Sequence, residues 1–176
     1  MIIEGERIYL TGISEPDEAY LRWMEDNEVT KYLETRFNPS SVGEIQHYLD
    51  AVNSNAGSFM FAIMKGNNLN TSEHIGNIKL GPIDWLHRFS SVGLLIGEKR
   101  LWGQGYGTEA IKIVVKFAFE TLNLHKLTAG CYKENIASIR AFQKAGFTVE
   151  GELKSQYLLE GKYTSGILLG LVNEGT

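Results

Sequence analysis

The chain has 176 residues, 43% of them hydrophobic and 22% charged, a size and composition typical of one globular domain over residues 1–176. Its net charge is −4 and no run of Lys or Arg occurs, which argues against binding to nucleic acid or to an anionic membrane. A single cysteine and four scattered histidines exclude an internal disulfide and predict no metal site, while a charged N terminus predicts a cytoplasmic protein.

The first half of the chain predicts a strand, two helices and three further strands. Arg7 to Ile13 has a strand pattern, and Ser14 is the expected cap of the first helix. Ser41-Val-Gly-Glu44 has the form of a capping box, which predicts the start of the second helix. The three strands are expected over 59–64, 75–83 and 91–97.

The second half of the chain predicts two more helices and a closing hairpin. A helix from Thr108 to about Leu122 carries its apolar residues on one face. A strand from Leu127 to Tyr132 follows, and then a helix capped by Asn135 and ended by Gly146. A hairpin over 151–172 comes last. This order predicts an α/β (mixed α+β) fold, with a mixed central sheet of about six to seven strands flanked by four helices.

Glycines are densest between the strand at 91–97 and the helix after it, where Gly103, Gly105 and Gly107 alternate with other residues. Without a Cβ, such residues let successive backbone N–H groups turn toward one point, and the positive end of the helix dipole lies beside them. Thr108-Glu109 follows the last glycine, so neither the Walker loop nor the dinucleotide fingerprint fits. The pattern favours a cradle for a phosphate or pyrophosphate, with a glycine-rich turn that binds nothing as the alternative.

Several ordered motifs together resemble one known family. Trp102-Gly-Gln-Gly-Tyr-Gly-Thr-Glu-Ala110, Leu122-Asn-Leu-His-Lys126 and Asn135-Ile-Ala-Ser-Ile-Arg-Ala-Phe-Gln-Lys-Ala-Gly-Phe147 resemble the GNAT superfamily of acetyl-CoA-dependent N-acetyltransferases. The branch that they resemble is the one related to ribosomal-protein N-terminal acetyltransferases. The resemblance covers nearly the whole chain and is strongest from Ile75 onward. It implies the acyl-CoA N-acyltransferase fold in a single GNAT domain.

The resemblance also implies a site for acetyl-CoA. Coenzyme A would lay its pyrophosphate on the N–H groups of residues 103 to 108, and its pantetheine arm along the strand at 94 to 96. A backbone N–H of Leu95 or Ile96 would stabilise the oxyanion, and Ser138 would lie near the sulfur, which makes these three the expected catalytic residues. The implied cofactor-binding residues are Leu94, Leu95, Ile96, Trp102, Gly103, Gln104, Gly105, Tyr106, Gly107, Thr108, Asn135, Ser138 and Phe142.

The general acid and the general base are left open by the sequence. Many family members carry a Tyr where this chain has Phe142, and that Tyr protonates the departing thiolate. A thiol pKa of about 8.5 makes the thiolate a tolerable leaving group, so an acid is not required. The alternative acids are Tyr106, Tyr132, Tyr157 and Tyr163. The candidate bases are Glu34, Asp84 and His87, with a water chain as a further option, and Glu109 is interpreted as a first-turn helix carboxylate.

The acceptor is expected to be an amine-bearing peptide or small molecule. In this fold the first helices and the last hairpin wall the acceptor site, which implies Trp23, Arg36, Phe37 and Tyr157 as substrate-binding residues. A protein N-terminal α-amine and a small amine remain rivals, and an amino sugar on a nucleotide carrier is an alternative. A non-catalytic acyl-CoA-binding module is the alternative from another class, and a homodimer is left open.

Overall fold

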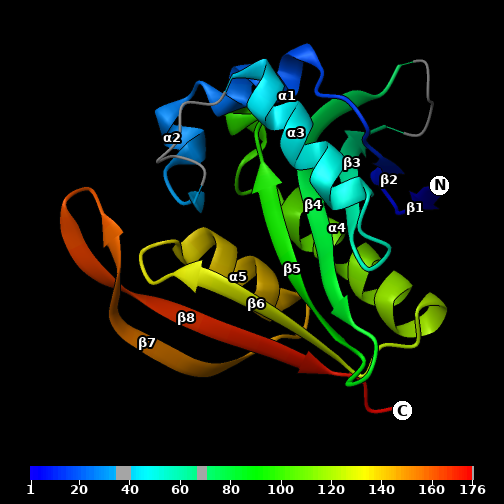
Figure 1. Ribbon diagram of the computed structural model, residues 1–176, viewed down its shortest axis with the longest axis vertical. Coiled ribbons are helices and arrows are strands. Elements are labelled where there is room, and N and C mark those ends of the chain that lie inside the picture. The colour runs from blue at the N-terminus through cyan, green and yellow to red at the C-terminus, as the bar shows by residue number, and fades with distance from the viewer. Residues whose placement is uncertain (35–40, 67–70, 176) are drawn as a thin grey trace.

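The computed structural model describes residues 1–34, 41–66 and 71–175. Its described strands form one mixed sheet, in the order β1-β2-β3-β4-β5-β6-β8-β7 (Figure 1). This confirms the predicted mixed fold, with one strand more than the upper expected count and five described α-helices in place of four. The extra strand is β1, which is three residues long and too short to show a pattern. The strands are β1 Ile2–Glu4, β2 Ile8–Gly12, β3 Phe59–Lys65, β4 Glu73–Asp84, β5 Phe89–Ile96, β6 Lys126–Tyr132, β7 Thr148–Leu159 and β8 Lys162–Val172.

Helices cover both faces of the sheet. The first group packs over one face, and the second group over the other (Figure 1). The first group is α1 Glu18–Met24, the short α2 Asn27–Thr30 and α3 Val42–Asn53. The second is α4 Tyr106–Lys116, which continues as a π-helical turn η3 over Phe117–Thr121, and α5 Ile136–Lys144; a 3₁₀ turn η2, Lys99–Leu101, lies between β5 and α4.

The predicted capping box is confirmed, and the predicted cap of the first helix is wrong. The Glu44 backbone N–H donates to Ser41 Oγ over 3.2 Å, while the Ser41 N–H donates to Glu44 Oε2 over 2.8 Å. Helix α1, in contrast, begins after Asp17 and not after Ser14. The Asp17 carboxylate accepts the Tyr20 N–H over 2.9 Å, and a carboxylate is the stronger acceptor at a helix N terminus.

Two apolar clusters hold the helices to the sheet. The larger cluster lies between the sheet and the pair α4 and α5, and includes Leu10, Ile78 and Val114, all fully buried. The smaller cluster lies under α1 and α3, and Trp23 and Leu49 are at its centre. Leu94 and Ile96 pack on the first cluster and Leu95 on the second, since successive side chains of a strand point to opposite faces.

The sheet opens between β5 and β6, the parallel pair among the described strands. Their pairing is confined to Phe89–Ser91 opposite Lys126–Thr128. Beyond these residues β5 continues along β4, and β6 continues along β8, so the two strands diverge (Figure 1). Among the described strands, residues 92–96 of β5 therefore have a neighbour on one side only. Unpaired backbone groups of this kind are a template for an extended ligand.

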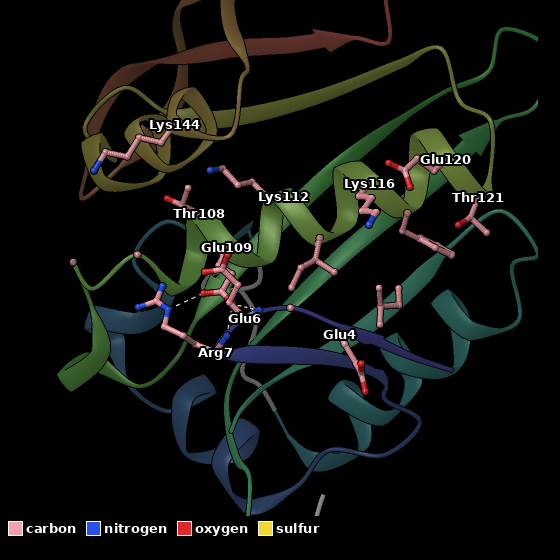
Figure 2. A pocket seen from close by; sticks show the side chains of 16 residues that line it. Glu4, Glu6, Arg7, Thr108, Glu109, Lys112, Lys116, Glu120, Thr121 and Lys144 are labelled. Atoms are coloured by element: carbon pink, nitrogen blue, oxygen red, sulfur yellow. Dashed lines mark hydrogen bonds and ion pairs between the residues drawn. The ribbon is translucent and has the colours of Figure 1, made fainter. Parts of the chain in front are cut away.

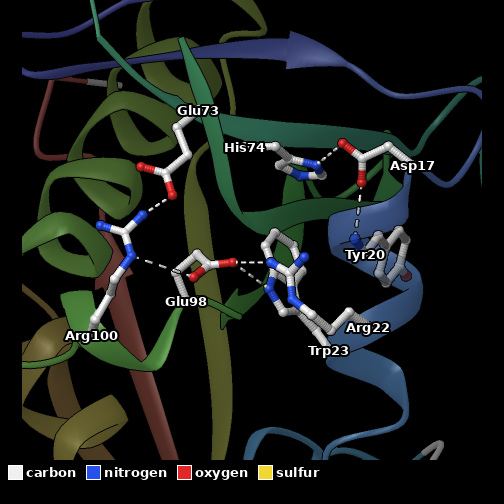
Figure 3. Close-up of polar contacts among 8 residues, drawn as sticks. All are labelled: Asp17, Tyr20, Arg22, Trp23, Glu73, His74, Glu98 and Arg100. Atoms are coloured by element: carbon white, nitrogen blue, oxygen red, sulfur yellow. Dashed lines mark hydrogen bonds and ion pairs between the residues drawn. The ribbon is translucent and has the colours of Figure 1, made fainter.

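A polar network fixes α1 to the end of β5 (Figure 3). Glu98 accepts hydrogen bonds from the Arg22 guanidinium and from the Trp23 indole N–H, the latter over 3.0 Å. The Trp23 ring lies so close to Gly97 that a Cβ there would come within 2.0 Å of it. Glycine is therefore needed at 97, because a larger residue would push away the Trp23 ring that packs α1 against the end of β5.

Candidate active site

The open side of β5 presents the backbone groups of Leu94 and Ile96. Gly97 N–H donates to the Ile75 carbonyl of β4 over 2.9 Å, and Leu95 is paired with Asn77. The bonding direction alternates along an antiparallel pair, so Leu95 points its N–H and C=O at β4. Leu94 and Ile96 then point theirs into the gap. Of the two residues that the sequence offered for an oxyanion contact, Ile96 is the one whose N–H faces the gap.

The glycine loop lies at the mouth of this gap and ends in α4. Gly103 and Gly105 have φ of +75° and +87°, in the left-handed region that favours glycine. Gly105 is the N-cap of α4 and has no side chain to cap it. The N–H groups of Tyr106, Gly107 and Thr108 precede the first intrahelical bond, which Glu109 N–H makes to Gly105 O. Within the described chain these groups have no hydrogen-bond partner, which makes them free to bind an anion.

The helix start is pressed closely against β5. A Cβ at Gly107 would lie 3.1 Å from Leu94 Cδ2 and 3.6 Å from Ile96 Cγ1. The third glycine is therefore needed for packing, while the first two are needed for backbone conformation. This close approach brings the N–H groups of α4 and the open backbone of β5 into one site.

The other predicted loop residues have mainly structural contacts. The Trp102 indole N–H donates to the Ile96 carbonyl over 2.7 Å, and the Gln104 side-chain amide donates to the Arg100 carbonyl over 2.8 Å. Tyr106 is buried at the start of α4. Thr108 is half-buried and lines an open groove beside the loop.

This groove runs between the β1–β2 turn and α4 (Figure 2). It encloses about 690 Å³, which lies in the range of small-molecule sites. Cations and carboxylates both line it, and Glu109 is paired with Arg7 at 2.8 Å. Its remaining charged lining residues are Glu4, Glu6, Lys112, Lys116, Glu120 and Lys144.

On the far side of the gap, α5 begins beside the end of β6. Asn135 is the N-cap, as predicted, and its Oδ1 accepts the Ser138 N–H over 3.2 Å. The Ser138 hydroxyl lies 3.3 Å from the Cys131 sulfur. Burial raises the pKa of the Cys131 thiol, although the Ser138 hydrogen bond acts in the opposite sense. Cys131 is thus a buried thiol, and Ser138 is half-buried beside it.

Phe142 and Trp23 are placed in the core. Phe142 is 2% exposed and packs edge-on against Phe147, at 5.1 Å between ring centroids. Trp23 is also 2% exposed. The ring is enclosed by α1, His74 and Gly97, and the expected contact of Trp23 with the acceptor stays a prediction. Arg36 and Phe37 lie outside the described residues.

The candidate bases separate clearly in space. Asp84 accepts the His87 N–H over 2.8 Å in the β4–β5 turn. That turn is at the opposite end of β5 from Ile96, about 20 Å away at 3.3 Å per residue. Glu34 instead accepts a hydrogen bond of 2.5 Å from the Tyr132 hydroxyl at the open end of β6. Glu34 is thus the one of the three that lies near the gap.

The tyrosines that were considered as acids lie in three different places. Tyr106 is under the glycine loop, and Tyr163 is 74% exposed near the β7–β8 turn. Tyr132 and Tyr157 pack on each other at 5.3 Å between centroids, on the side of Glu34. Tyr132 is buried and Tyr157 half-buried, and with the exposed Glu34 they form an aromatic and acidic cluster at the open end of the gap.

The sequence interpretation missed one contact of the site. The sequence predicts a strand at Arg7 and a first helix turn at Glu109, yet Arg7 Nε donates to Glu109 Oε2 over 2.8 Å. Because 102 residues separate them, no local pattern indicates the pair.

No described helix is long and apolar enough to cross a membrane. Nor do the residues that the structure describes include a group of three or more potential metal ligands.

The opened parallel pair, the glycine loop and the N terminus of α4 define an acyl-CoA N-acyltransferase fold. The family model of the acetyltransferase (GNAT) domain matches residues 7–148. The chain therefore belongs to the GNAT acetyltransferase domain family.

Individual N-acetyltransferases share moderate sequence identity with this chain. Spermidine N(1)-acetyltransferase of Escherichia coli (strain K12) is 35% identical over 95 residues, 54% of this chain and 50% of that protein. The match thus spans about half the length of that relative. The uncharacterized N-acetyltransferase YoaA of Bacillus subtilis is 29% identical over 163 residues, 90% of this chain and 89% of that protein.

Solved structures share the fold at low sequence identity. The ribosomal alpha-N-protein acetyltransferase RimL, in complex with coenzyme A, has a TM-score of 0.84 at 17% identity, over 100% of both chains. Spermidine N-acetyltransferase of Vibrio cholerae, in complex with coenzyme A and spermine, has a TM-score of 0.79 at 19% identity, over 94% of this chain and 95% of that one. At such identities these likenesses concern the fold.

Proposed function

We propose that the protein transfers an acetyl group from acetyl-CoA to a primary amine, by direct attack in a ternary complex. The observation that carries this proposal is the opened β5–β6 pair, with free N–H groups of the glycine loop at its mouth. Membership of the GNAT family supports the same activity. The reaction needs no covalent intermediate on the protein, and the buried Cys131 has a raised thiol pKa that disfavours a nucleophilic role.

The residues around the gap fit coenzyme A in both charge and shape. The N–H groups of residues 105–108 and the positive end of α4 suit a pyrophosphate. Lys112 and Lys144 line the adjoining groove, but Glu4, Glu6 and Glu120 line it too, so the charge that suits the ligand comes from the helix start. The N–H and C=O of Leu94 and the N–H of Ile96 suit the amides of an extended pantetheine arm, while the Ile96 carbonyl already accepts the Trp102 indole N–H. Asn135 caps α5 through Oδ1, so its amide nitrogen is available to donate a hydrogen bond.

Acetyl-CoA supplies an activated acetyl group on a thiol leaving group. As the amine adds to the carbonyl carbon, negative charge develops on the carbonyl oxygen, and the Ile96 N–H is aimed to stabilise it. We further propose that the Ser138 hydroxyl, which contacts the Cys131 sulfur in this structure, donates a hydrogen bond to the leaving sulfur as the C–S bond breaks. A thiolate with a conjugate-acid pKa of about 8.5 needs no stronger acid at neutral pH. The fully buried Phe142 is consistent with a reaction that uses no aromatic hydroxyl at that position.

The acceptor must reach the gap from its open end. An ammonium group has to lose a proton before it attacks, and we assign this role to Glu34, which accepts the Tyr132 hydroxyl on that side. The half-buried Tyr157 ring and the exposed Glu34 carboxylate together favour a cationic amine. The names of the relatives include spermidine and protein N-terminal acetyltransferases, which supports a polyamine or a peptide amine. We favour these over an amino sugar on a nucleotide carrier, because the Glu34 carboxylate would repel the phosphates of such an acceptor.

The experiment that tests the proposal is a thiol-release assay with acetyl-CoA and a panel of acceptors: spermidine, N-terminal peptides, amino-sugar nucleotides and simple diamines. Coenzyme A binding is measured in parallel by calorimetry. Turnover with at least one primary amine is expected. Binding of coenzyme A without turnover of any acceptor would favour the acyl-CoA-binding module, and the absence of coenzyme A binding would refute the cofactor site.

A further inference from the structure

We propose that Arg7 is a positioning residue for the phosphate cradle, held by Glu109 and acting through the Gln104 carbonyl. The proposal rests on the function proposed above, because it concerns how the glycine loop is prepared for coenzyme A. Figure 2 shows the arrangement, in which Arg7 projects from the β1–β2 turn toward the first turn of α4.

Glu109 anchors the β1–β2 turn to α4. Its Oε1 accepts the backbone N–H groups of Glu6, Arg7 and Ile8 over 3.0, 2.8 and 3.3 Å, and its Oε2 accepts Arg7 Nε over 2.8 Å. The Glu109 side chain is 15% exposed, so water competes little for these bonds. A first-turn carboxylate that needed only to complement the helix dipole would require none of these contacts. The carboxylate therefore fixes where the Arg7 guanidinium lies.

Arg7 uses a second edge of its guanidinium on the glycine loop. Its Nη1 donates to the Gln104 carbonyl over 3.1 Å, and its Cζ lies 4.5 Å from the centre of the Tyr106 ring. A Cβ at Gly105 would lie 3.4 Å from Arg7 Nη2. The planar fork of an arginine can serve a carboxylate and a carbonyl at fixed angles, which a lysine ammonium cannot reproduce.

The peptide group between Gln104 and Gly105 connects Arg7 to the phosphate cradle. The Gln104 carbonyl and the Gly105 N–H belong to the same trans peptide and point in opposite directions. A carbonyl held against Arg7 therefore directs the Gly105 N–H away from Arg7, and in the proposal this orientation adds it to the free N–H groups of the helix start. Gly105 has φ of +87° and no side-chain cap, so nothing in its own chemistry selects this orientation over a flipped peptide.

The inference is tested by comparing two acetyl donors on Arg7→Gln, Arg7→Lys and Glu109→Gln. Calorimetry gives the coenzyme A dissociation constant, and a steady-state assay gives kcat/KM for acetyl-CoA and for S-acetylpantetheine, which lacks the pyrophosphate. We expect Arg7→Gln and Glu109→Gln to weaken coenzyme A binding about 10- to 100-fold, the range for losing a hydrogen bond to a charged group. The kcat/KM for S-acetylpantetheine is expected to stay within about twofold, since no phosphate is bound.

Arg88→Gln is the matched control, because Arg88 lies in the β4–β5 turn at the far end of β5 and its loss removes the same charge. Coenzyme A binding by this variant is expected to be unchanged. Full affinity in Arg7→Lys would mean that charge alone suffices and would overturn the positioning role. Equal losses with both donors would show a general structural defect and would also overturn it. If the wild type itself does not bind coenzyme A, the proposed function fails instead, and the two failures remain distinguishable.

Discussion

The indole N–H of Trp102 donates to the carbonyl of Ile96 over 2.7 Å, which ties the residue that opens the glycine loop to the last residue of β5. The hydrogen bond joins the two ends of the connection that contains η2. The pantetheine track and the phosphate cradle are thereby held at a fixed separation, although they lie on different elements.

Replacing Trp102 by Phe removes the N–H donor but keeps an aromatic ring, so it tests the hydrogen bond separately from the packing of the ring. We expect Trp102→Phe to weaken coenzyme A binding by about 5- to 10-fold, the equivalent of one neutral hydrogen bond of about 1 kcal/mol. Calorimetric titration measures the change. Trp85→Phe, at the exposed tip of the β4–β5 turn, is the control and should bind normally.

Gly105→Asp should abolish coenzyme A binding while the protein stays folded. The substitution adds a carboxylate to a cradle built for an anion, and a Cβ at 105 meets no atom closer than 3.4 Å. Gly105→Ala separates the effect of backbone conformation from that of charge. Unchanged affinity in a folded Gly105→Asp protein would mean that the loop is only a turn.

Phe142→Tyr should not accelerate the reaction by more than about tenfold, against the 10²- to 10⁴-fold typical of a limiting general acid. The ring is fully buried, so the new hydroxyl would also cost about 1–3 kcal/mol of stability if it finds no partner. Tyr106, Tyr132, Tyr157 and Tyr163, each changed singly to Phe, should likewise keep most of kcat. A loss above about a hundredfold in one of them, with acetyl-CoA affinity intact, would identify that residue as the acid.

Ser138→Ala is expected to lower kcat by about 10- to 100-fold with little change in coenzyme A affinity, since its hydrogen bond strengthens as the sulfur gains charge. Single-turnover rates and calorimetry measure the two quantities. Ala137→Ser is the control, because it adds a hydroxyl at the preceding, exposed position of α5 and should leave both quantities unchanged. A normal rate in Ser138→Ala would remove the hydroxyl from the mechanism.

The Cys131 thiol should react slowly with iodoacetamide at neutral pH. Burial raises its pKa, and the thiolate is the reactive form, so the rate should increase with pH beyond the range where an exposed thiol has levelled off. Ser138→Ala removes the hydrogen bond that lowers the pKa and should shift the profile to still higher pH. Mass spectrometry of the alkylated chain gives the rate, and a profile like that of a free thiol would contradict the assignment.

The capping box, the glycine loop and the Asn135 cap were predictable because each depends on residues within a few positions of one another. The same local chemistry determined the order of strands and helices, and motif order indicated the family. Local patterns failed where two possible capping residues lay close together, as with Ser14 and Asp17, or where a strand was as short as β1.

Tertiary structure alone decided which side of β5 is open, because the orientation of Leu95 and Ile96 depends on pairing with β4. It also decided that Trp23 and Phe142 are core residues, that Asp84 and His87 lie at the wrong end of the sheet, and that Glu34 meets Tyr132. The Arg7–Glu109 pair is likewise a contact that only the tertiary structure decides. Contacts across about a hundred residues arise from how the sheet and helices pack, and sequence periodicity carries only the spacing within each element.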